Sequence, residues 1–127
     1  MHGVTITELI EKMNLRNSTP QIDTDKIVLT HPDVNRPALQ LTGFFDHFDR
    51  ERVQIIGYVE YTFLEKMTDE DKKKRIYETL LSYKIPCLIF CRNLPPEKML
   101  LEMAEKANIP VFQTEKKTSE FTAEIIR

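Results

Sequence analysis

Glycine is scarce in this sequence: Gly3, Gly43 and Gly57 are the three among 127 residues. Two common nucleotide-phosphate patterns, G-x-x-x-x-G-K-[ST] and G-x-G-x-x-G, depend on closely spaced glycines that let the backbone approach the phosphates. Neither pattern can be written from the three positions. A nucleotide site that depends on either glycine-rich loop is therefore excluded within these residues.

Cysteine is equally scarce, since Cys87 and Cys91 are the only two. Both lie in one apparent strand, where four residues span about 13 Å, whereas a disulfide needs Cα atoms within about 7 Å. No histidine lies near them in the sequence, so the pair makes a poor zinc site. We expect both side chains to be buried, reduced thiols.

The chain also lacks an excess of charge and long apolar runs. It has 18 basic and 20 acidic side chains, which argues against nucleic acid as a partner. Its longest apolar runs, such as residues 87–90, are far short of the roughly 20 residues that cross a bilayer. No secretory signal pattern opens the sequence. We therefore expect a cytoplasmic protein that binds neither nucleic acid nor membrane.

What is present indicates a single α/β domain. The sequence is 41% hydrophobic and 30% charged, as in soluble globular proteins. In the first half of the chain we expect a helix capped by Thr5 or Thr7, a strand at 26–30, a helical turn at 37–41 and a strand or strand-to-helix joint at 52–59. A helix that stops near Thr68 follows, and Thr68 or Asp69 opens the next helix. The last expected elements are a strand at 86–91, a helix at 95–108 and a strand at 109–114.

Residues 87–114 have the length of a βαβ unit, and their first strand is nearly continuously apolar, as in a parallel sheet covered on both faces. The fold class is therefore α/β, with a small, mostly parallel central sheet flanked by helices. The charged run at 69–74 is expected to face water.

The last residues predict the start of another helix. Thr118 or Ser119 can cap it, and Phe121 and Ile125 begin an apolar face. A helix this short is marginal alone. We expect residues 1–117 to form the domain, and residues 118–127 to begin a linker helix that continues beyond Arg127.

Candidate contact residues cluster around a short helical turn. Pro37 suits its first turn and Gly43 its left-handed exit. Asp33 and Arg36, which precede this turn, are candidates for a polar contact point; the alternative is an internal salt bridge or cap that fixes the loop. Thr42 belongs to the same motif. No catalytic, cofactor-binding or metal-ligating residue is identified in this chain.

Two further positions leave alternatives open. His47 lies between Asp46 and Asp49, an arrangement compatible with proton transfer or with a solvated polar cluster. Gly57 lies between apolar stretches, where it could admit a ligand or backbone, or simply allow close packing.

Residues 36–48 read Arg-Pro-Ala-Leu-Gln-Leu-Thr-Gly-Phe-Phe-Asp-His-Phe. This segment resembles the N-terminal domain of bacterial HPr kinase/phosphorylase, where a segment close to Arg-Pro-Gly-Leu-Glu-Leu-Thr-Gly-Tyr/Phe-Phe-Asp-Tyr/His-Phe occurs. The resemblance continues through residues 51–67 and 85–112, so that it spans nearly the whole chain. Ala38 departs from the glycine of the family pattern.

The resemblance implies a function that belongs to a longer protein. Full-length members phosphorylate a serine of the phosphocarrier HPr with ATP or pyrophosphate and a divalent metal, and remove that phosphate by phosphorolysis, in control of carbon-source use. Their P-loop and catalytic residues lie in a C-terminal kinase domain, and the enzymes are hexamers. The N-terminal domain is similar to that of the Mur ligases.

By this resemblance the chain is a non-catalytic regulatory or assembly domain, without cofactor and inactive alone. Its partners are the kinase domain, sister subunits and, through the full-length enzyme, HPr. The alternatives are a stand-alone ligand-sensing module of the same fold, without kinase activity, and a uridine-nucleotide binder of the Mur type.

Overall fold

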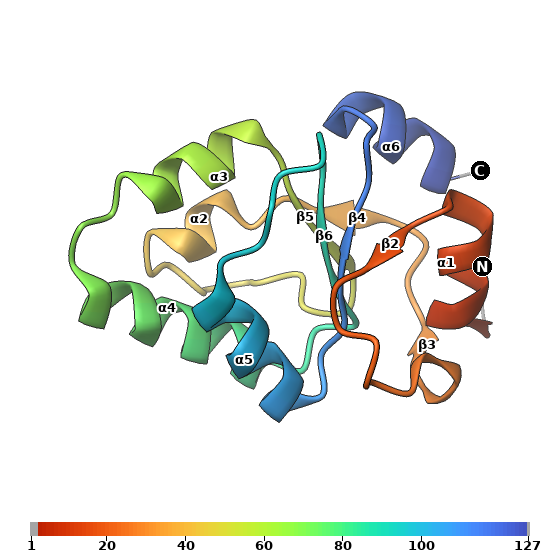
Figure 1. Cartoon of the computed structure of the whole chain (residues 1–127), viewed down its shortest axis with the longest axis horizontal. Helices are drawn as coiled ribbons and strands as arrows, with labels where there is room; N and C mark the ends of the chain where they lie inside the picture. Colours follow the sequence, from red (N-terminus) through yellow and green to blue (C-terminus); the bar gives the residue numbers. More distant parts are fainter. Residues whose placement is uncertain (1–2, 127) are drawn as a thin grey trace.

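The computed structural model describes residues 3–126 and is organised around a five-stranded sheet (Figure 1). The strand order is β2-β7-β6-β5-β4; β2 pairs antiparallel with β7, and the other pairs are parallel. The strands are β2 (Arg16–Asn17), β4 (Val34–Asn35), β5 (Val53–Ile56), β6 (Leu88–Phe90) and β7 (Val111–Gln113). The predicted α/β fold with a mostly parallel sheet is confirmed.

Helices cover both faces of this sheet. From β4 to β7 the chain always steps to the neighbouring strand in one direction, so the helices that connect these strands gather on one face (Figure 1). These helices are α2 (Ala38–Leu41), α3 (Tyr58–Glu65), α4 (Glu70–Ser82) and α5 (Lys98–Ala107). Helices α1 (Ile6–Met13) and α6 (Thr118–Ile125) cover the other face.

Two cores follow from the alternation of side chains along each strand. Ile56, Phe90 and Val111 face the core under α2–α5. Ile55, Ile89 and Phe112 face the core under α1 and α6. Because both faces are covered, the central strand β6 is apolar at every position, which explains why it reads as a continuous hydrophobic run.

A second, two-stranded sheet pairs β1 (Val4–Thr5) with β3 (Val28–Leu29) beside α1. The predicted strand at 26–30 thus forms in part, and lies outside the main sheet. A 3-10 turn, η1 (Thr24–Lys26), precedes β3. Thr5 caps α1, because its hydroxyl accepts the Glu8 N–H at 3.2 Å while the Glu8 carboxylate accepts the Thr5 N–H at 3.0 Å.

Some of the predicted helix boundaries are confirmed. Asp69 caps α4, and Asn108 ends α5 in the left-handed conformation with φ of 59°. Other boundaries differ. Pro37 is the N-cap residue of α2 rather than part of its first turn, and α3 ends at Glu65 rather than near Thr68. Helix α5 begins at Lys98 rather than at residue 95, and the N-cap residue of α6 is Lys117 rather than Thr118 or Ser119.

The predicted thiols are confirmed as unpaired and buried, since Cys87 and Cys91 are both 0% exposed. Helix α6 also contributes to the core on their side of the sheet. Its Phe121 is 0% exposed and its Ile125 is 3% exposed. The helix is therefore fastened to the domain by its apolar face, while the domain boundary at residue 117 stays a prediction.

Replacing Phe121 tests how strongly α6 belongs to the fold. Phe121→Ala removes a fully buried ring, so we expect a loss of about 3–5 kcal/mol in the free energy of unfolding, measured by urea denaturation. Phe44→Ala is the control, because that ring is 49% exposed and its loss should cost under about 1 kcal/mol. Equal losses in the two variants would show that α6 is not part of the cooperative unit.

Candidate functional site

Ligands of open α/β proteins usually bind outside the carboxyl ends of the parallel strands. In this fold, Arg36 follows β4, Gly57 follows β5 and Cys91 follows β6. Glu60 of α3 and Thr118 of α6 reach the same place. We call these five residues the carboxyl-edge junction.

The centre of the carboxyl-edge junction is the Glu60 carboxylate, which is 3% exposed. Its Oε1 accepts the Gly57 N–H at 2.7 Å and lies 2.9 Å from Nη2 of Arg36. Glu60 is the third residue of α3, where a carboxylate also meets the positive end of the helix dipole. One buried carboxylate therefore connects the ends of two neighbouring strands.

Gly57 gives the carboxyl-edge junction its close packing. A Cβ at this position would lie 2.6 Å from Oγ1 of Thr118 and 2.7 Å from Nη2 of Arg36. Any side chain would therefore have to push both groups aside. Of the two roles foreseen for this glycine, the structure shows close packing against the protein's own side chains.

Cys91 completes the carboxyl-edge junction but is poorly suited to act as a nucleophile. Burial raises the pKa of its thiol, and the hydrogen bond from Thr118 and the charge of Arg36 oppose that effect only in part. A thiolate is the reactive form of cysteine. In this environment the thiol stays protonated near neutral pH.

The carboxyl-edge junction thus satisfies its own polar groups. Among residues 3–126, no buried side-chain nitrogen or oxygen lacks a hydrogen-bond partner. The same residues contain no cluster of three His, Cys, Asp or Glu side chains that could hold a metal ion. What this arrangement does chemically is to fix strand ends and helix starts relative to one another.

The other candidate residues lie apart from this carboxylate. Asp33 faces Arg52, with Oδ2 of Asp33 3.7 Å from Nη1 of Arg52. The Thr42 hydroxyl donates to the Leu39 carbonyl at 2.6 Å and so closes the end of α2. Among the described residues no hydrogen bond or ion pair links Asp33 to Arg36, so the two form no common contact point in this structure.

Gly43 and His47 lie in the loop that follows α2. Gly43 has φ of +99°, as its predicted left-handed exit requires, and His47 is exposed with φ of +60°. Aromatic rings help to hold the loop against α4. Phe45 stacks on Tyr83 with centroids 5.3 Å apart, and Phe48 meets the same ring edge-on at 5.2 Å.

A second buried polar cluster joins α4 to α5. Lys73 is only 8% exposed at its side chain, and its Nζ lies 3.4 Å from Oε2 of Glu97. The Tyr77 hydroxyl donates to Oε1 of the same carboxylate at 2.7 Å. Burial is the main cause that raises the pKa of this phenol, and the hydrogen bond to Glu97 is the second. The prediction that the whole run 69–74 faces water is therefore wrong at Lys73, because the stem of this residue packs between two helices.

Neither Glu60 nor Glu97 was recognised from the sequence. A signal existed for Glu60, because a glutamate three residues after a strand-ending glycine occupies the position of a capping box. Glu97 precedes a helix and follows two prolines, and nothing local indicates that its partners lie on another helix. Both residues act through contacts that only the folded chain creates.

The chain matches a known protein family along nearly its whole length. The sequence model of the family described as "HPr Serine kinase N terminus" matches residues 4–127 of this chain. The chain belongs to the HPr serine kinase N-terminal family. The resemblance seen in residues 36–48 is thereby confirmed over almost the entire chain.

Curated relatives of this family are longer proteins. The HPr kinase/phosphorylase of Lachnoclostridium phytofermentans is 52% identical over 127 residues, which are 100% of this chain and 41% of that protein. The HPr kinase/phosphorylase of Clostridium perfringens strain 13 is 39% identical over 97% of this chain and 39% of its own length. The chain thus spans about two fifths of the relatives it matches.

A solved structure supports the fold independently. The CBS and DRTGG domains of the regulatory region of Clostridium perfringens pyrophosphatase, complexed with the activator diadenosine tetraphosphate, match with a TM-score of 0.66. The match covers 96% of this chain and 46% of that one, at 18% sequence identity. At this identity the likeness concerns the fold alone.

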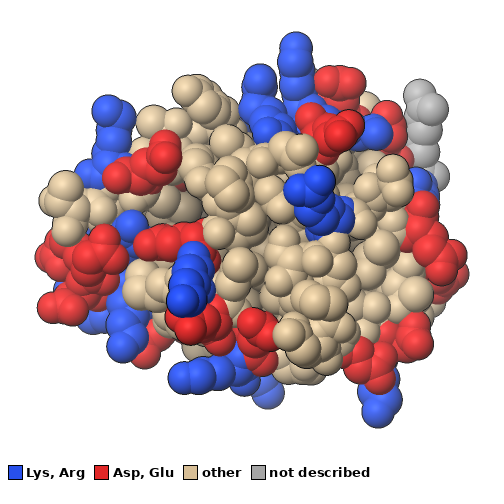
Figure 2. Space-filling view, in the orientation of Figure 1, with Lys and Arg blue, Asp and Glu red and all other residues tan. Residues whose placement is uncertain are grey.

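The surface and the helices agree with the bulk composition. Figure 2 shows basic and acidic side chains intermingled over the visible face, in keeping with a net charge of -2. Within residues 3–126, none of the helices combines the length and the apolar character needed to cross a bilayer.

A double-mutant cycle tests the carboxyl-edge junction. Arg36→Met leaves a buried carboxylate with one donor fewer, so we expect it to lower the free energy of unfolding by about 1–3 kcal/mol. Combined with Glu60→Gln, the cycle should give a coupling of about 0.5–3 kcal/mol.

The matched control is the pair Arg52 and Asp33, whose carboxylate is 50% exposed and lies 3.7 Å from Nη1 of Arg52. Its coupling should stay under about 1 kcal/mol. A coupling for Arg36 and Glu60 no larger than that of the control pair would contradict the role given to Glu60.

Proposed function

We propose that this chain is the non-catalytic N-terminal part of a longer HPr kinase/phosphorylase, where it serves regulation or assembly. The observation that carries the proposal is the family match over residues 4–127, combined with the chain's share of about two fifths of its relatives. The remaining three fifths of such a protein would hold the phosphoryl-transfer machinery.

The chemistry of the described residues supports this division. The three glycines cannot form a phosphate-binding loop of the P-loop type. The carboxyl-edge junction, where a ligand of an α/β protein would be sought, is filled by Arg36, Glu60 and Thr118. In this proposal ATP or pyrophosphate and a divalent metal bind to the absent part of the protein.

The partners follow from the same proposal. The longer protein would act on a serine of HPr in the cytoplasm, and this domain would contact the kinase domain and sister subunits of an oligomer. The hexamer suggested by the resemblance belongs to this proposal as well.

A ligand-sensing module without kinase activity is the second candidate. Its support is the likeness in fold to a regulatory region that was solved with an activator bound. The two candidates differ in the coding sequence expected downstream of Arg127. A G-x-x-x-x-G-K-[ST] pattern within about one domain length supports the kinase, and a stop codon directly after Arg127 supports the module.

Phosphate transfer to HPr provides the functional test. We expect the full-length protein to label HPr from radioactive ATP, and the chain of residues 1–127 to label none, because it lacks a phosphate-binding loop. A protein without residues 1–117 should keep the P-loop and differ from the full-length protein in oligomeric mass by light scattering or in its response to effectors.

The proposal fails if residues 1–127 alone phosphorylate HPr in a clean preparation. The regulatory or assembly role fails if removing residues 1–117 changes neither the oligomeric mass nor the response to effectors.

A further inference from the structure

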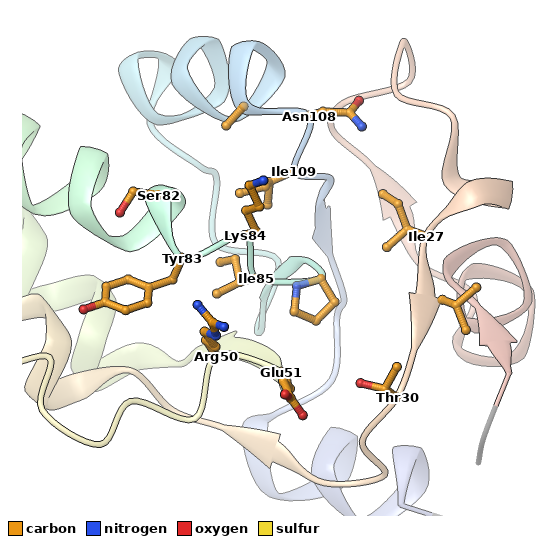
Figure 3. Close-up of a pocket in the computed structure, with 13 residues that line it drawn as sticks. Ile27, Thr30, Arg50, Glu51, Ser82, Tyr83, Lys84, Ile85, Asn108 and Ile109 are labelled. Atoms are coloured by element: carbon orange, nitrogen blue, oxygen red, sulfur yellow. The ribbon is translucent and has the colours of Figure 1, made fainter.

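A hollow of about 780 Å³ lies at the edge of the sheet opposite the carboxyl-edge junction (Figure 3). Its lining comes from segments that precede three parallel strands: residues 50–51 before β5, 82–86 before β6 and 107–109 before β7. Residues 27, 28 and 30, in and around β3, form the facing wall. We call this feature the amino-edge hollow.

Two cationic side chains line the amino-edge hollow, Arg50 and Lys84, together with one carboxylate, Glu51. In Figure 3 the Arg50 side chain extends from its loop toward Ile85, and Glu51 extends from the same loop in the opposite direction. Among residues 3–126 neither cation has a carboxylate within 4.0 Å. The hollow therefore offers two cations without an anionic partner from the described residues.

Lys84 occupies a backbone position that its side chain does not favour. It follows the C-cap residue of α4 with φ of +55°, and its N–H donates to the Leu81 carbonyl at 3.2 Å. Glycine or asparagine is the usual residue at such a helix exit, and α5 uses Asn108 at the equivalent place. The backbone conformation therefore does not select a lysine at this position.

Apolar surface lies beside these cations. Val28 is 46% exposed although it belongs to a strand, and Ile27, Pro86 and Ile109 also line the hollow. Small-molecule sites in proteins combine such an apolar lining with a few polar groups that orient the ligand. The hydroxyl of Thr30 and the amide of Asn108 are further polar groups on the rim.

We propose that the amino-edge hollow binds a small organic anion with an apolar body. Arg50 and Lys84 supply the positive charge that attracts the anionic group. The apolar body lies against Val28 and Pro86, which are not buried. The ends of α4 and α5 place carbonyl oxygens at the same edge, and Glu51 adds a carboxylate, so both cations are needed to make the site attractive to an anion.

The dye 8-anilinonaphthalene-1-sulfonate is a suitable probe, because it joins a sulfonate to an apolar ring system. Titrated into the chain of residues 1–127 and followed by amide NMR, it should shift the signals of Val28, Thr30, Lys84 and Asn108 most strongly. By dye fluorescence, Arg50→Gln and Lys84→Asn should each raise the dissociation constant at least five-fold.

Two controls separate charge from packing. Lys84→Asn places a residue suited to a left-handed exit, so its thermal unfolding midpoint should not fall. Lys66→Gln removes an exposed cation elsewhere and should leave the dissociation constant unchanged. The uncharged analogue N-phenyl-1-naphthylamine should bind at least five-fold more weakly than the sulfonate.

The opposite results overturn the proposal. The first is an absence of saturable binding, and the second is equal affinity for the charged and uncharged dyes. The third is unchanged affinity in both Arg50→Gln and Lys84→Asn. The fourth is a set of signal shifts centred on exposed residues of α2 and α3, namely Leu39, Val59 and Phe63. In that last case the dye reports a general apolar surface, and Lys84 serves only the helix end.

Discussion

The carboxyl edge of this fold depends on one buried carboxylate. Glu60 is 3% exposed, and its charge is stabilised by the Gly57 N–H and the Arg36 guanidinium. A buried charge without such partners would strongly destabilise the domain. Because Arg36 follows β4 and Gly57 follows β5, the Glu60 side chain fixes the ends of these two strands relative to each other. Gly57 has no side chain, and this leaves room for Thr118 at the start of α6 to pack beside it.

This constraint gives the two edges of the sheet different characters. At the carboxyl edge, where open α/β proteins commonly bind ligands, the protein's own side chains occupy the position. At the amino edge, the turns after α4 and α5 leave a hollow with two cations, neither of which has a described carboxylate within 4.0 Å. The sheet is therefore closed by side chains at its carboxyl edge and open at its amino edge.

Much of the fold was predictable because its signals are local. Thr5, Asp69 and Gly43 mark element ends through capping or left-handed geometry, and the apolar run of β6 indicates a strand covered on both faces. Strands β1, β2 and β4 were missed, since two residues are too few to show a period. Gln54, in the middle of β5, is 0% exposed because its amide donates to two loop carbonyls, a pairing that no pattern reveals.

The candidate site was less predictable for the same reason. Arg36 was singled out, and an internal salt bridge was one of the two outcomes considered, but its partner lies 24 residues away. Lys73 belongs to a charged run whose neighbours are exposed, and only the packing of α4 on α5 takes its side chain out of water. Spacing along the chain predicts faces of helices and strands, whereas partners across the fold depend on the tertiary arrangement.

Amide hydrogen exchange at Gly57 measures whether Glu60 holds the strand ends together through buried contacts. The bond from this N–H to Glu60 is 2.7 Å long and buried. We expect the Gly57 amide to exchange as slowly as the amides of Ile55 and Ile89 in the core strands, and much faster in the Glu60→Ala variant. Exchange of Gly57 in the unaltered protein at the rate of unprotected loop amides would contradict it.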